Sequence, residues 1–139
     1  MAAKDFTLYK VADTTPMITL DKASATVIEA GDMVGLTNGL AVKAGAATSK
    51  IAYAPFGAGD GDTEIQVVAD PNALYLGTAD ANFAVTDRGA EVDMVVTSST
   101  QYVDIGASST DVFLVYPGTD DNVATGATPV VVKINKPLF

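Results

Sequence analysis

Residues 27–44 read VIEAGDMVGLTNGLAVKA, a succession of a strand, an acidic turn, a second strand, an Asn-Gly turn and a third strand. Asn38 and Gly39 are residue types that readily adopt positive φ, which a two-residue type I′ hairpin requires. The apolar runs at 33–36 and 40–42, on either side of this turn, are typical of strands. The stretch therefore predicts a small all-β protein.

Short apolar and β-branched runs recur along the rest of the chain, each bounded by Gly, Pro, Asp or Ser. We expect strands at 51–54, 64–69, 74–78, 91–96, 102–105, 112–116 and 130–134. Residues 44–50 and 80–84 are too short to be stable helices, so we expect loops there. The predicted fold class is all-β: a small β-sandwich or a β-tulip-like barrel with an extended N-terminal arm.

The first 25 residues differ from the rest of the chain. Residues 6–11 could be extended, but the sequence Asp-Thr-Thr-Pro at 13–16 breaks this segment, and residues 21–24 are typical of a loop. A chain of 139 residues is long enough for one stable core and too short for two. We therefore predict an N-terminal arm at 1–25 and a single β domain at 26–139.

The composition favours binding over catalysis. The chain has no His, no Cys and no Trp, and Arg88 is its single arginine, so most residue types that perform nucleophilic and acid-base chemistry are absent. The net charge is −9, and phosphate binding depends on Lys and Arg. We expect a protein that is not an enzyme, has no cofactor and binds no nucleic acid.

The sequence also gives no membrane signal. No stretch approaches 18 consecutive apolar residues, and the N-terminal sequence MAAKDFTLYK lacks the apolar core of a secretory signal. We expect a protein that is made in the cytoplasm and has no membrane partner.

The acidic loop at 57–64 is a candidate metal-binding site. Three carboxylates alternate there, as at the start of a calcium loop. Counting from Asp60, however, the sixth and twelfth positions are Ile65 and Pro71, where an EF-hand loop needs Gly and Glu. We predict a flexible acidic loop and no metal site.

Two other acidic groups are candidates for the catalytic carboxylates of glycoside hydrolysis: the pair at 120–121, and Asp87, Glu91 and Asp93. Adjacent residues on a strand point to opposite faces, and loop carboxylates are normally solvated, so we predict no catalytic residue. Arg88 lies at a turn before Gly89, where a surface ion pair with Asp87 or Glu91 is the default, and a contact with a partner carboxylate is the alternative.

Both ends of the chain carry large apolar side chains. Such ends either fold back on their own domain or dock on a neighbouring chain, where adding a strand to a sheet edge is one mode. The predicted partner-binding residues are Phe6, Leu8, Tyr9, Val11, Arg88, Leu138 and Phe139. Small side chains and apolar termini also predict self-association, with three-fold symmetry favoured.

Several of these patterns are similar to those of the head decoration, or cement, proteins of tailed bacteriophages, over roughly residues 26–134. The segments that carry the resemblance are EAGDMV at 29–34, the Asn-Gly turn with LAVKA at 40–44, the Gly-Asp loop at 59–62, QYVDIG at 101–106 and DVFLV at 111–115. The resemblance implies a β-sandwich or β-tulip subunit that assembles as a homotrimer, or as a dimer, on the outer capsid surface of the virion. Its partner would be the major capsid (coat) protein.

Two alternatives belong to other classes of protein. One is a β-sandwich module for carbohydrate binding or adhesion at a virion or cell surface, which predicts exposed aromatic residues on one sheet face. The other is a trimeric β nucleotide hydrolase, for which the required carboxylate, base and phosphate-binding motifs are absent.

Overall fold

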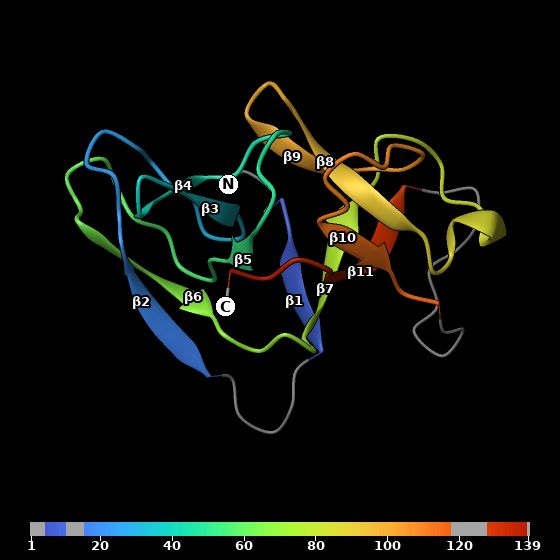
Figure 1. The fold of residues 1–139 in the computed structure, drawn as a ribbon, viewed down its shortest axis with the longest axis horizontal. Helices are drawn as coiled ribbons and strands as arrows, with labels where there is room; N and C mark the ends of the chain where they lie inside the picture. Colours follow the sequence, from blue (N-terminus) through green and yellow to red (C-terminus); the bar gives the residue numbers. More distant parts are fainter. Residues whose placement is uncertain (1–4, 11–15, 118–127, 139) are drawn as a thin grey trace.

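The computed structural model describes residues 5–10, 16–117 and 128–138, which form eleven strands and one short 3-10 helix, η1 (Figure 1). The elements are β1 (Thr7–Lys10), β2 (Met17–Asp21), β3 (Met33–Thr37), β4 (Leu40–Lys43), β5 (Ala52–Tyr53), β6 (Glu64–Val68), β7 (Leu74–Thr78), η1 (Val85–Asp87), β8 (Glu91–Thr97), β9 (Thr100–Asp104), β10 (Phe113–Val115) and β11 (Pro129–Ile134). The predicted all-β class is confirmed, and the segments at 44–50 and 80–84 are loops, as expected.

The strands form two antiparallel sheets. The six-stranded sheet has the order β1-β7-β11-β10-β8-β9, and the five-stranded sheet has the order β2-β6-β5-β3-β4. Figure 1 shows the five-stranded sheet on the left, β8 to β11 on the right, and β1 with β7 between them. Within the described residues neither sheet closes into a barrel, so the sandwich is the observed form of the predicted fold.

The Asn-Gly turn joins β3 to β4, as the sequence predicts. Asn38 has a φ of 52° and Gly39 a φ of 81°, the positive values that a type I′ turn needs at both central residues. Thr37 and Leu40 are therefore directly opposite each other in the ladder. The hairpin leaves Leu36 and Leu40 exposed near its tip.

The five-stranded sheet curls so that its first and last strands approach each other. Lys22, just after β2, forms a bridge with Ala41 of β4, and the backbone N–H of Ala23 donates to the Ala41 carbonyl at 3.1 Å. A small apolar cluster forms on one face of this sheet. Its buried members are Ile28, Val34, Ala41, Ala52, Ala54, Ala58, Ile65 and Val67, with Leu20 and Leu138 packed against them.

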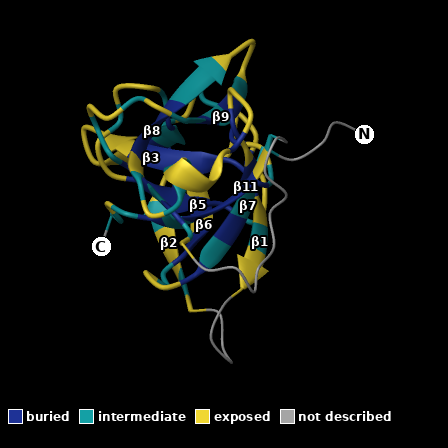
Figure 2. Ribbon diagram, turned by 90° about the vertical axis from the view of Figure 1, so that its right-hand side faces the viewer, coloured by how far each residue is buried: buried dark blue, intermediate teal, exposed yellow. Residues whose placement is uncertain are grey.

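The larger core combines residues of both sheets. Strand alternation sends Met33, Tyr53 and Val68 to the face of the five-stranded sheet opposite the small cluster. There they share a core with residues of the six-stranded sheet such as Tyr75 and Phe113. Figure 2 shows the resulting pattern, with buried residues in the inner strands and exposed residues along β1 and β2.

The expected separation of residues 1–25 as an arm needs correction for the part that is described. Phe6 is fully buried in the larger core, and β1 pairs with β7, while β2 pairs with β6 of the other sheet. Phe6 lies in the chain's own core and Leu8 packs against it. No local sequence signal distinguishes apolar residues that enter the core from those of a chain end that docks on a partner. The first strands are therefore parts of the β domain.

Gln101 links the two sheets through a buried amide. Its side chain accepts the Met33 N–H at 2.8 Å and donates to the carbonyls of Met33 and Ala44 at 2.8 and 2.9 Å. The Gln101 backbone N–H donates to the Asp5 carboxylate at 2.9 Å. The amide thus satisfies three buried backbone groups at the end of the five-stranded sheet.

Asp93 organises the turn that leads into β10. Its carboxylate accepts the backbone N–H groups of Ser109, Thr110 and Asp111 at 2.8 to 2.9 Å. Burial by itself would raise the pKa of Asp93, but the N–H donors at 111, 109 and 110 outweigh it and hold the pKa below its ordinary value. Asp104, directly opposite in the ladder, has a raised pKa because of burial and the neighbouring Asp80 side chain.

The lowered pKa of Asp93 and the raised pKa of Asp104 predict that the two carboxylates affect stability differently as pH changes. A carboxylate whose pKa is lowered by folding stabilises the fold above its unfolded pKa of about 3.9, and this contribution is lost as pH falls through the folded pKa. Asp93→Asn should therefore lower the free energy of unfolding at pH 7 by about 1–3 kcal/mol, with a smaller difference from wild type in acid. Asp104→Asn is the control and should leave stability at pH 7 unchanged or higher, because the ionised form is disfavoured there. Thermal unfolding at pH 7 and pH 3 measures both variants. A stability difference between wild type and Asp93→Asn that is larger at pH 3 than at pH 7 would contradict the lowered pKa of Asp93.

Candidate functional site

The structure separates the residues that were predicted to bind a partner. Phe6 lies in the core and Leu8 packs against it, so neither offers a free side chain for docking. Tyr9 is exposed on β1. Val11 and Phe139 lie outside the described residues. Arg88 and Leu138 lie in different parts of the fold and do not form one site with Tyr9.

Arg88 follows η1 and is half-buried. Its backbone N–H donates to the Val85 carbonyl at 3.1 Å, which ends the 3-10 turn. In the described part of the chain Arg88 forms no ion pair with Asp87 or Glu91, so the default prediction was wrong. The Asp87 carboxylate instead accepts the Ala84 N–H at 2.8 Å, a local cap that competes for the same oxygen atoms.

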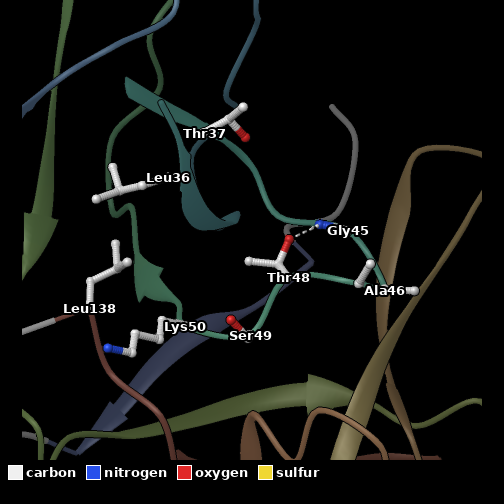
Figure 3. A pocket seen from close by; sticks show the side chains of 9 residues that line it. Leu36, Thr37, Gly45, Ala46, Thr48, Ser49, Lys50 and Leu138 are labelled. Atoms are coloured by element: carbon white, nitrogen blue, oxygen red, sulfur yellow. Dashed lines mark hydrogen bonds between the residues drawn. The ribbon is translucent and has the colours of Figure 1, made fainter. Parts of the chain in front are cut away.

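Leu138 lines an open cavity of about 730 Å³ at one end of the five-stranded sheet (Figure 3). The cavity lies between the β3-β4 hairpin, the loop that leads to β5 and the C-terminal segment. Its lining residues are Leu36, Thr37, Gly45, Ala46, Ala47, Thr48, Ser49, Lys50 and Leu138. Leu36 and Leu138 supply the large apolar side chains, and Figure 3 shows both on the same side of the cavity.

Close packing across β3 fixes the walls of this cavity. Thr48 lies over Gly35, where an added Cβ would come within 2.4 Å of the Thr48 methyl carbon, so a larger residue at Gly35 would push the loop away. The Gly45 N–H donates to the Thr48 hydroxyl at 3.0 Å, which closes the loop on itself. The Leu138 N–H donates to the Ile51 carbonyl at 3.1 Å and holds the C-terminal segment beside it.

Two lysines near this end have different surroundings. Lys43 lies 3.5 Å from the Asp32 carboxylate and 3.6 Å from that of Asp5, so its charge is paired within the fold. Burial raises the pKa of Asp32, although the Glu29 backbone N–H and Lys43 oppose this effect. Lys50 is exposed at the cavity, and its ammonium forms no ion pair with any described residue. The site thus offers apolar side chains beside one available cation.

Exposed apolar side chains are concentrated in the same half of the molecule. Among the described residues, the exposed large apolar or aromatic side chains are Tyr9, Ile18, Val27, Leu36, Leu40, Phe56 and Val85. Five of these seven belong to β2, to β6 or to the chain between them, which form the five-stranded sheet and its loops. Leu36 and Leu40 were not predicted as binding residues, although their places beside the Asn-Gly turn were a usable signal, because side chains at a hairpin tip have few neighbours to cover them.

The other chemical hypotheses find no further support in the described residues. Asp62 of the acidic loop accepts the Gly59 N–H at 2.8 Å, so this carboxylate stabilises its own turn. Across residues 5–10, 16–117 and 128–138, no group of three or more His, Cys, Asp or Glu side chains is placed to hold a metal ion. In the same ranges, no helix has the length and apolar character to span a membrane.

Comparisons with protein-family models, with curated proteins and with solved structures give no match. The described surface has an open, partly apolar cavity beside an exposed hairpin, and it is suited to receiving part of another molecule.

Proposed function

We propose that this chain is a capsid decoration protein, which binds the outer surface of a phage head and stabilises it by bridging neighbouring coat subunits. The observation that carries the proposal is the cavity between the hairpin and the C-terminal segment, with Leu36 44% exposed and Leu138 beside it. A monomeric protein gains nothing from leaving Leu36 in water, whereas a docked coat subunit would cover it together with the accessible part of Leu138. The resemblance at 29–34, 40–44 and 101–106 supports the same function.

The chemistry of the cavity favours a particular kind of contact. Leu36, Leu138 and the Thr48 methyl group would pack against an apolar side chain of the coat protein. Lys50 at the same cavity would pair with a neighbouring carboxylate, and the hydroxyl groups of Thr37 and Ser49 would bind backbone groups. An apolar side chain flanked by an acidic residue is therefore the expected feature of the coat surface.

The mechanical effect follows from linkage. A protein that binds only where adjacent coat subunits are correctly spaced stabilises that spacing by its binding free energy, and the stabilisation grows with occupancy. If the chain assembles as a trimer, or as a dimer, one oligomer presents several copies of the cavity. The second and third contacts then form at high effective concentration, so weak contacts together hold the head against internal pressure.

The binding test uses Leu36→Asp. Covering a leucine side chain contributes about 1.5–3 kcal/mol, so placing a charge there should weaken binding to phage heads tenfold or more. Val85→Asp is the matched control, since Val85 is also exposed but lies on η1 in the other half of the fold. Purified heads lacking the protein are mixed with each variant, and the bound fraction is measured by cosedimentation. The proposal requires that the wild type and Val85→Asp sediment with the heads and that Leu36→Asp stays in solution; equal binding by all three would reject the cavity as the contact.

A further inference from the structure

A second exposed site lies around Phe56, on the loop that follows β5. Phe56 is 61% exposed, more than any other large apolar side chain in the described part of the chain. Beside it is a shallow cavity of about 260 Å³. The cavity is lined by Thr19, Phe56, Gly57, Glu64, Ile65 and Gln66.

Sheet register places the polar lining side chains together. Thr19 of β2 is directly opposite Gln66 of β6, and Glu64 is two residues from Gln66, so all three side chains lie on the same face. The hydroxyl, the amide and the carboxylate form no hydrogen bond with any other described residue, so they are available to a ligand. Asp21 is opposite Glu64, so two carboxylates lie at this end of the face.

The loop backbone holds Phe56 in a fixed place. Ile28 and Ala58 exchange two backbone hydrogen bonds, at 3.0 and 2.8 Å, immediately beyond Gly57. An added Cβ at Gly57 would lie 3.2 Å from the Ile28 carbonyl and 3.3 Å from the Ala30 nitrogen, so the chain passes close to the 28–30 segment. The backbone beside this exposed ring is therefore anchored, so a ligand does not have to order the loop when it binds.

These groups together define the class of ligand. An aromatic face attracts the partially positive C–H groups of another molecule, and the amide, hydroxyl and carboxylate exchange hydrogen bonds with hydroxyl groups. A wholly apolar ligand would leave the polar groups desolvated and unpaired, and an anionic ligand would be repelled by Asp21 and Glu64. A sugar ring has both an apolar C–H face and a rim of hydroxyl groups.

We propose that Phe56, Thr19, Glu64 and Gln66 form a binding site for a neutral saccharide, with the sugar ring stacked on Phe56. The carboxylate of Glu64 accepts hydrogen bonds from ring hydroxyl groups, and the Gln66 amide both donates and accepts. The small cavity volume matches one sugar unit of a larger glycan, so binding by a single site is weak and gains strength from several copies.

This saccharide site is separate from the proposed coat contact. Strands β3 and β5 are antiparallel, with Met33 opposite Tyr53 and Val34 opposite Ala52. Leu36 and Phe56 therefore lie toward opposite ends of this strand pair. The saccharide proposal therefore does not depend on head binding, and each can fail without the other.

The test is a titration of the isolated full chain, labelled with nitrogen-15, with glucose, galactose, mannose and N-acetylglucosamine and with disaccharides of each. At least one sugar should shift the amide signals of residues 56–57 and 64–66, and Phe56→Ala should weaken the binding tenfold or more. Gln66→Ala should weaken it as well. Tyr9→Ala removes another exposed aromatic ring, on β1, and should bind the same sugar like the wild type.

Two results would overturn the proposal. One is the absence of localised shifts with every sugar at concentrations of tens of millimolar, with the protein shown to be folded by its spectrum. The other is sugar binding that Phe56→Ala and Gln66→Ala leave unchanged, which would place the ligand elsewhere. A sialylated sugar that bound more tightly than its neutral parent would also contradict the role assigned to Glu64.

Discussion

Replacing Phe6 by alanine is expected to lower the free energy of unfolding by about 3–5 kcal/mol. The Phe6 ring is fully buried, lies 5.3 Å from the Phe113 ring between centroids, and fills the space over Gly77, where a Cβ would come within 2.4 Å of it. The Phe6 backbone is also bound, since its N–H donates to the Gly31 carbonyl at 3.0 Å and its carbonyl accepts the Tyr53 hydroxyl at 3.2 Å.

Chemical denaturation of Phe6→Ala and of the matched control Tyr9→Ala measures this effect. Tyr9 is 41% exposed on the same strand, so its replacement should cost less than about 1 kcal/mol. Deleting residues 2–12 should destabilise the protein at least as much as Phe6→Ala, because β1 is lost with the side chain. If Phe6→Ala unfolds like the wild type, residues 1–25 are an independent arm and the described position of Phe6 is wrong.

Replacing Gln101 by leucine is expected to lower the free energy of unfolding by about 2–6 kcal/mol, at about 1–3 kcal/mol for each buried group left unpaired. The leucine keeps the volume of the side chain but leaves the Met33 N–H and the Ala44 carbonyl without the partner that Gln101 provides. The Met33 carbonyl loses one of two donors and keeps the Ala44 N–H at 3.0 Å. The loss should loosen the contact between β9 and the five-stranded sheet, because this amide joins them.

Gln66→Leu is the control for Gln101→Leu, because it makes the same chemical change at an exposed position of β6. Its effect on stability should lie within about 0.5 kcal/mol. Urea unfolding followed by far-ultraviolet circular dichroism measures both variants. Equal midpoints for the two would show that Gln101 does not hold the sheets together.

The local features of the fold could be predicted from the sequence because they depend on neighbouring residues. The Asn38–Gly39 turn has one strongly favoured geometry, and the predicted runs at 74–78 and 91–96 have the β-branched or aromatic residues and bounding turns that strands require. The observed strands Leu74–Thr78 and Glu91–Thr97 accordingly agree with the predicted ranges to within one residue.

The arrangement in space could not be predicted in the same way. Strand β1, which follows Phe6, pairs with β7 about 70 positions later, and Gln101 binds Met33 across 68 positions. No local sequence pattern shows either contact. An apolar residue near a terminus has the same sequence signature whether it enters the core or docks on a partner. Leu138 was predicted to bind a partner, but only the fold shows that Leu36 lines the same cavity.

The most direct measurement is an electron cryo-microscopy reconstruction of phage heads incubated with this protein. We predict density for the protein on the outer surface of the head, at positions where coat subunits meet, with the end that carries Leu36 and Leu138 facing the shell. A reconstruction in which the outer surface is bare, or in which that end faces the solvent, would contradict the proposed function.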